Sequence, residues 1–170
     1  MSTVDPVDTR LLEHLSLRIE RQLDALRHAC FRFEVLRAVV TAGKQEWLPE
    51  SNADLAQALG ALQQTDRDLR SSLVDAAVSL GLSSESTLRE VGVAAPEPWD
   101  FVFARHREAI EQWARQANEL ARACTQILRK LLSTLDMALT MIGGEAPIGY
   151  DETGGEGPVT GSIGLVNTRI

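Results

Sequence analysis

The chain has 170 residues, which is enough for one domain with a modest hydrophobic core. Its 17 Lys and Arg residues are outnumbered by 24 Asp and Glu residues, so the formal net charge is −7 at pH 7. This acidic balance, without any long basic run, argues against a general nucleic-acid-binding protein. The sequence also has no apolar stretch long enough to span a bilayer and no N-terminal apolar core typical of a secretory signal. The cytoplasm is therefore the expected compartment.

A repeat of apolar residues predicts a first long helix over residues 8–42. The members of this repeat are Leu12, Leu15, Ile19, Leu23, Leu26, Cys30, Phe33, Leu36 and Val40. They recur with a mean step of about 3.5 residues, which is the period of helices that wrap around one another. Asp8 or Thr9 can cap the start of this helix, and Gly43 fits its end.

A second helix is predicted over residues 52–80, after a break at Pro49, because proline is not tolerated in a helix interior. Ser51 or Asn52 is the expected N-terminal cap. The apolar side of this helix follows Leu55, Leu59, Leu62, Asp66, Leu69, Leu73, Ala76 and Leu80. Asp66 either fixes the register of the packing or, in the favoured interpretation, lies at its solvated margin.

A connector of small and polar residues follows, with room for one helical turn, and then a third and longest helix over residues 97–142. Pro96 and Pro98 suit its start, and Gly143 with Gly144 ends it. Its apolar seam comprises Trp99, Phe103, His106, Ile110, Trp113, Ala117, Leu120, Cys124, Ile127, Leu131, Leu135, Ala138 and Ile142. At 1.5 Å per residue, this helix is roughly 65 Å long.

The order of these elements predicts an all-α fold, an up-down-up stack of antiparallel long helices that resembles a coiled coil. Residues 1–143 form a single helical domain. Residues 144–170 hold most of the 12 glycines of the chain without a recognisable helical period, so a flexible Gly-rich tail is expected there. Residues 158–170 leave open one or two short strands formed against a partner, although their glycines disfavour this.

The residue types that usually carry catalysis or bind metals are scattered along the chain. His14, His28 and His106 stand far apart in the sequence. His106 falls on the seam of the third helix, where a hydrogen-bonded or marginal position is favoured over a role as a metal ligand. Cys30 and Cys124 fit as small buried hydrophobic residues in a reducing compartment. The sequence therefore predicts a protein with no catalytic residues, no metal and no cofactor.

One enzymatic alternative stays open at this point. All-helical mutases bind acidic substrates between long helices through buried arginines. The arginines available here are Arg18, Arg21, Arg37, Arg67, Arg70 and Arg105. Their places in the helical repeat predict exposed side chains, which disfavours a buried anion site.

The third helix carries more apolar residues near its end than a bundle helix needs, which is about three positions in seven. Between residues 127 and 142 they are Ile127, Leu128, Leu131, Leu132, Leu135, Met137, Ala138, Leu139, Met141 and Ile142. Either the other helices or a second copy of the chain cover them, or they form a surface for a partner helix. Met137 and Met141 suit a partner surface, because thioether side chains adapt to varied apolar partners.

Three stretches of the sequence resemble the flagellar type III export chaperones of the FlgN family. They are "LGALQQTDRDLRSSL" followed by "SLGL", then "QANELARACTQILRKLLSTLDMALTMIGG", and finally "GYDETGG", which places Tyr150 and Gly154 in a Y-x-x-x-G pattern. The resemblance covers about residues 10–155. It implies a cytoplasmic, non-catalytic chaperone with the same layout of long helices.

The resemblance also implies partners. Members of the family hold the C-terminal amphipathic segments of hook–filament junction (hook-associated) proteins and deliver them to the cytoplasmic domain of the membrane export gate. The client-binding residues implied here are Ile127, Leu128, Leu131, Leu132, Leu135, Leu139 and Ile142, to which the apolar excess adds Met137 and Met141. No nucleic acid and no direct membrane insertion are expected. Pairing of two chains stays open, and a structural or adaptor bundle that binds other coiled coils is the main alternative function.

Tyr150, the only tyrosine of the chain, is implied by the resemblance to contact the export gate. A rigid aromatic side chain on a flexible leash can enter a shallow pocket with little loss of side-chain entropy. The alternative is that Tyr150 folds back and fixes the tail to the bundle.

Overall fold

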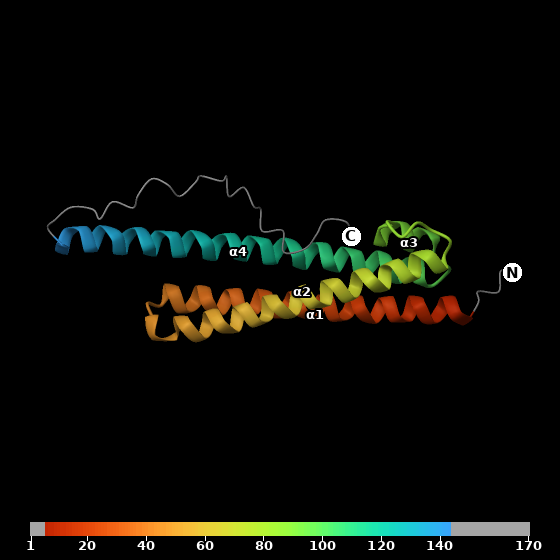
Figure 1. Cartoon of the computed structure of the whole chain (residues 1–170), viewed down its shortest axis with the longest axis horizontal. Helices are drawn as coiled ribbons and strands as arrows, with labels where there is room; N and C mark the ends of the chain where they lie inside the picture. The colour runs from red at the N-terminus through yellow and green to blue at the C-terminus, as the bar shows by residue number, and fades with distance from the viewer. Residues whose placement is uncertain (1–5, 144–170) are drawn as a thin grey trace.

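The structure, a computed structural model, describes residues 6–143 of the chain. That part is helical and contains no β-strand, so the predicted all-α class is confirmed (Figure 1). The elements in chain order are α1 (Pro6–Thr41), a short 3-10 helix η1 (Gln45–Trp47), α2 (Leu48–Ser79), α3 (Leu88–Ala94) and α4 (Trp99–Gly143). The predicted tail, residues 144–170, lies outside the described residues, and so do Tyr150 and the strands considered for residues 158–170.

Helix α2 begins four residues before its predicted start at residue 52, and the reason is Pro49. Proline lacks a backbone N–H, but the first turn of a helix has no acceptor for that group, so Pro49 is accommodated at the start of the helix. The predicted caps Ser51 and Asn52 are therefore wrong. The cap position is occupied by Trp47, without a side-chain hydrogen bond, and Ser51 is buried inside the first turns.

Helix α1 is the element that the other long helices share. It packs along α2 and along α4, whereas the backbones of α2 and α4 make no close approach within the described part of the chain. Contacts between α1 and α4 keep a similar sequence separation along both helices, 90 residues for Ser16 with His106, 83 for Cys30 with Trp113 and 91 for Phe33 with Cys124. The two helices therefore run parallel, and α2 runs back between them in sequence, which confirms the up-down-up order (Figure 1).

The core follows the apolar seam of α1. Leu12, Leu15, Ile19 and Leu26 have no exposed surface. Helix α2 covers this seam from one side and α4 from the other, with these buried residues: Leu55, Leu62, Leu69, Phe103, Ile110, Ala117 and Leu120. The mean step of about 3.5 residues keeps this row of side chains on the buried side along the whole helix. One row of apolar residues on α1 is therefore enough to form an elongated core.

Both cysteines are free and buried between α1 and α4, as the sequence predicted. The thiol of Cys124 donates to the backbone oxygen of Phe33 at 3.4 Å, and the thiol of Cys30 lies 3.9 Å from the backbone oxygen of Trp113. Burial raises the pKa of both thiols above their usual value, because a thiolate would lose its hydration there. They therefore pack as small, protonated hydrophobic groups.

The connector between α2 and α4 is more ordered than the single turn expected from its composition. Thr87 caps α3 by accepting from the backbone N–H of Glu90 at 3.3 Å, and Glu90 accepts from the backbone N–H of Thr87 at 2.7 Å. This reciprocal capping box satisfies two N–H groups that a short helix would otherwise leave unpaired. Helix α3 packs on the first turns of α4, where Trp99 and Phe103 stack with ring centroids 5.6 Å apart.

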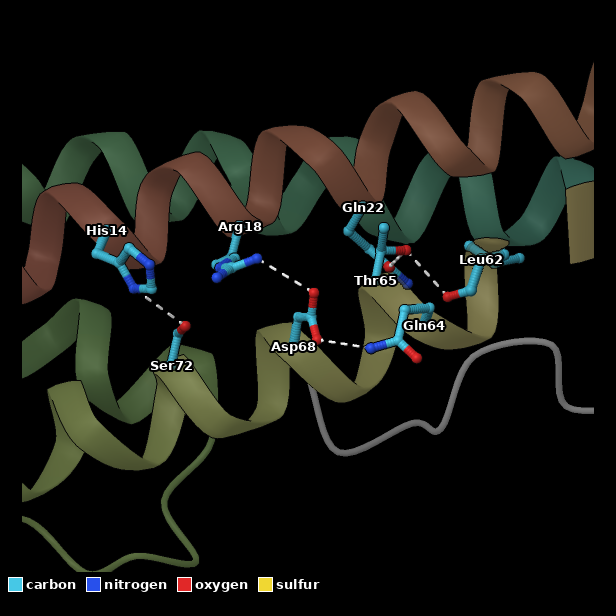
Figure 2. Close-up of polar contacts among 8 residues, drawn as sticks. All are labelled: His14, Arg18, Gln22, Leu62, Gln64, Thr65, Asp68 and Ser72. Atoms are coloured by element: carbon cyan, nitrogen blue, oxygen red, sulfur yellow. Dashed lines mark hydrogen bonds and ion pairs between the residues drawn. The ribbon is translucent and has the colours of Figure 1, made fainter. Parts of the chain in front are cut away.

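A row of polar contacts joins α1 to α2 (Figure 2). His14 Nδ1 lies 3.3 Å from Ser72 Oγ, and Arg18 pairs with Asp68 at 3.1 Å. Gln22 has no exposed surface, and its side-chain oxygen accepts from the Thr65 hydroxyl. If one helix shifted along the other, every one of these pairs would break and buried polar atoms would lose their hydrogen-bond partners. The row of contacts therefore fixes the register of α1 and α2.

The exposure of the arginines and of Asp66 can be compared with the predictions from the helical repeats. The helical repeat predicts an exposed Arg18, but its side chain is half-buried because its guanidinium reaches across to Asp68 on α2. The remaining arginines considered for an anion site are exposed: Arg21, Arg37, Arg67, Arg70 and Arg105. Asp66 lies at the half-buried margin of α2 and pairs with Arg70 at 2.7 Å, in line with the interpretation favoured from the sequence.

Candidate functional site

Helix α4 extends beyond the tip of the hairpin formed by α1 and α2 (Figure 1). The end of α1 reaches only as far as Ile127 and Leu128, which lie beside Leu36 and Val40. From Arg129 to Met141 every side chain is exposed except Leu131, which is half-buried. These residues up to Gly143 form an overhang of about 22 Å, at 1.5 Å per residue.

The overhang presents a continuous apolar face. Its exposed members include Leu132 at 66%, Leu135 at 56% and Leu139 at 67% relative accessibility. We define the distal stripe as Leu128, Leu131, Leu132, Leu135 and Leu139. Steps of three and four residues place these side chains on one side of the helix.

The distal stripe continues the buried seam of α4. Ala117, Leu120 and Cys124 are buried against α1, and Leu128 follows Cys124 by four residues, on the same face. The face that α1 covers upstream is thus bare downstream, because α1 ends at Thr41 and the chain turns back into α2. The structure therefore leaves open one half of a helix–helix interface.

The predicted site residues outside the stripe have different surroundings. Ile127 is half-buried where α1 ends. Met137 is 56% and Met141 84% exposed, but a rotation of about 100° per residue places Met137 about 200° from Leu135. The two methionines therefore do not share a face with the leucines. Ile142 belongs to α4, and its side chain lies outside the described residues.

Polar groups on the overhang leave the stripe undisturbed. Arg129, Lys130 and Asp136 are exposed. The hydroxyl of Thr134 donates to the backbone oxygen of Lys130 at 2.9 Å, and that of Thr140 donates to the backbone oxygen of Asp136 at 2.8 Å. Both hydroxyls therefore have hydrogen-bond partners within the helix, and the surface left for a partner to cover is that of the leucine side chains. Covering an exposed leucine of this kind contributes about 1–2 kcal/mol.

A second group of exposed apolar residues lies at the other end of the molecule and is not predicted by the apolar repeats of the sequence. Val93 on α3 is 82% exposed and Phe101 on α4 is 64% exposed. Beside them, Gly92, Phe103 and the arginines Arg89 and Arg107 line a hollow of about 290 Å³. Phe101 lies two residues from both Trp99 and Phe103, which places it off the apolar seam of α4. This position is the feature of the sequence that indicates an exposed aromatic side chain.

The described residues were compared with the arrangements that bind metal ions or anions. Within residues 6–143, no three His, Cys, Asp or Glu side chains gather as they would around a metal ion. A groove of about 500 Å³ along α1 and α4 contains Arg37 and Arg115, but Glu34 pairs with Arg37 at 2.6 Å and Glu119 also lines the groove. None of the helices in this range has the length and apolarity of a membrane span.

His106 is hydrogen-bonded, as predicted: its Nε2 lies 2.9 Å from Ser16 Oγ, between α4 and α1. Burial lowers the pKa of His106 below its usual 6.5, an effect that the nearby Glu20 partly offsets. The unfolded chain therefore binds a proton at His106 more readily than the folded chain does. The resulting stability is fully present above pH 6.5 and is lost as the pH falls below it.

We expect His106→Gln to reduce the loss of stability on acidification from pH 7.5 to pH 5.5, because glutamine keeps a hydrogen-bonding group beside Ser16 and does not titrate. Urea unfolding of both proteins at several pH values measures this. An unchanged slope in His106→Gln would contradict the prediction.

Comparison of the chain with known protein families, with curated proteins and with solved structures finds no match.

Proposed function

We propose that this protein is a cytoplasmic, non-catalytic chaperone of flagellar type III export that holds the C-terminal amphipathic segments of hook–filament junction proteins. The observation that carries the proposal is the bare distal stripe, where Leu132, Leu135 and Leu139 are each more than half exposed. Contiguous exposed apolar surface on a water-soluble domain is typical of an interaction site. The resemblance of the sequence to the FlgN family supplies the identity of the partner.

The geometry supports a specific mode of binding. An amphipathic helix with apolar residues at i, i+3, i+4 and i+7 would lie on the stripe in line with the end of α1, so that the buried seam of α4 is extended by a second chain. The client would place its own apolar face against these leucines. Its assembly surface is then covered, which is how such a complex keeps a junction protein unassembled before export.

The direct test is co-purification of the full chain with the hook–filament junction proteins of a flagellated host, compared with the Leu132→Asp variant. We expect one junction protein to bind through its C-terminal segment and to be lost from the variant. Absence of binding to all of them by the wild-type chain would refute the export role.

The gate contact is the second part of the proposal, and it rests on the resemblance alone, since Tyr150 lies outside the described residues. We expect Tyr150→Ala to leave the affinity for the client segment unchanged and to weaken binding to the cytoplasmic domain of the export gate about tenfold or more, as for loss of an aromatic anchor. Titration of each partner with both proteins measures this. Equal losses for both partners would refute the division of labour between helix and tail.

An adaptor bundle that binds other coiled coils is the second candidate, because the distal stripe continues a seam with coiled-coil spacing. This alternative predicts binding to unrelated amphipathic helices and full binding by a chain that ends at Gly143. The export chaperone should instead prefer the junction segments and require the residues after Gly143 for delivery.

A further inference from the structure

The sequence beyond α4 contains a set of apolar residues whose spacing matches that of the stripe. Four of the five stripe residues, Leu128, Leu132, Leu135 and Leu139, are separated by 4, 3 and 4 residues. In the last part of the chain, Val159, Ile163, Val166 and Ile170 follow one another in the same steps. The interrupting glycines hide this repeat when the segment is considered alone.

We propose that residues 158–170 dock on the distal stripe as a built-in occupant, antiparallel to α4, and that the client displaces them. In this register Val159 faces Leu139 and Ile163 faces Leu135. Val166 and Ile170 then face Leu132 and Leu128, so that all four pairs match at once. The occupant is an intramolecular amphipathic segment, and only the displacement step rests on the proposed function.

The length of chain between the two segments permits this arrangement. Fourteen residues, 144–157, separate the end of α4 from Pro158. A Gly-rich linker of this length has a root-mean-square end-to-end distance of about 20 Å. Antiparallel docking only requires Val159 to return to Leu139, one helical turn before Gly143, which is well within that reach. Pro158 is suited to the first position of a helix.

The composition of the segment makes the docking reversible. Gly161 and Gly164 disfavour a helix because glycine loses more backbone freedom than other residues, so the segment gains helical order only by covering the stripe. Attachment to the same chain supplies an effective concentration of the order of millimolar, which compensates for weak intrinsic affinity. A longer client helix without internal glycines would bind more tightly and displace it.

The test is amide hydrogen exchange of residues 131–141 in the full chain, at low micromolar protein concentration. The variant Ile163→Asp with Val166→Asp places two charges on the docking face of the segment. The matched control, Thr160→Asp with Thr168→Asp, adds the same charge at positions about 100° and 180° away from Val159. All four substitutions lie outside the described helices, and both variants should keep the melting temperature of the wild-type protein.

We expect exchange over the stripe to be about tenfold faster in the docking-face variant and unchanged in the control. Equal exchange in all three proteins would overturn the proposal. Exchange that slows with protein concentration, equally in all three, would also overturn it and would assign the stripe to a second copy of the chain.

A junction-protein segment added as a synthetic peptide separates this proposal from the proposed function. If the segment docks and the chaperone reading is right, the peptide binds several-fold more tightly to the docking-face variant than to the control. If exchange shows docking but the peptide binds neither protein, the export role fails and the intramolecular contact stands. If the peptide binds both equally and exchange is also unchanged, the intramolecular contact fails and the export role stands.

Discussion

Leu135→Asp is expected to weaken binding of an amphipathic client segment by 30-fold or more while leaving the fold intact. Leu135 lies at the centre of the distal stripe and is 56% exposed, so the isolated protein loses little packing when it is replaced. In the complex the aspartate would be buried against apolar groups without a partner. Truncation of a central interface residue costs about 2 kcal/mol or more, and burial of an unpaired charge adds to that cost. Isothermal titration with the segment, together with circular dichroism, measures both effects.

Ser133→Asp is the matched control for this change. Ser133 is exposed on the same turn of α4, about 160° around the helix from Leu135, and aspartate there introduces the same charge away from the stripe. Its affinity for the segment should stay within about twofold of wild type. A comparable loss in both variants would indicate a general electrostatic effect, and a collapse of helicity in Leu135→Asp would assign the stripe to the core.

Leu26→Ala is expected to lower the free energy of unfolding by about 3–5 kcal/mol, the largest stability effect among these substitutions. Leu26 has no exposed surface on α1, the helix that packs against both α2 and α4. Its truncation removes buried methyl groups and leaves a cavity that three packed helices cannot easily collapse. Because a domain of this size is stable by only about 5–15 kcal/mol, the loss is a large fraction of the total. Urea denaturation followed by circular dichroism measures it.

Leu139→Ala tests the same chemical change on the overhang. Leu139 is 67% exposed, and alanine is the better helix former, so the free energy of unfolding should change by no more than about 0.5 kcal/mol. The contrast between the two substitutions separates leucines that hold the fold from leucines that await a partner. Similar losses at both positions would show that Leu139 belongs to the cooperatively unfolding core of the protein.

The positions of the long helices could be predicted from the sequence because their apolar repeats are long and regular. The predicted ranges for α1 and α4 differ from the observed ends by no more than two residues. The start of α2 was misplaced because Pro49 is compatible with two situations, a break between helices and the first turn of a new one. Only the backbone geometry before it, at Trp47, distinguishes them.

The apolar excess on α4 was visible in the sequence, but its meaning was not. A helical repeat gives the direction of each side chain around its own axis and does not say where a neighbouring helix stops. A count of apolar residues between 127 and 142 includes Met137 and Met141 with the leucines. The rotation of about 100° per residue places both methionines on other faces of the helix. The polar pairs between α1 and α2 were similarly hidden, since Arg18 and Asp68 are 50 residues apart in sequence.

The sequence by itself determined that the chain forms long helices, which face of each helix is apolar, and that the end of the last helix has more apolar surface than a bundle requires. These properties depend on the local spacing of residues, which a single helix already expresses. Only the tertiary structure decided that α1 stands between α2 and α4, and that the hairpin ends before α4 does. The distal stripe is bare because the partners of a seam are set by where distant segments of the chain end, and this is a property of their packing.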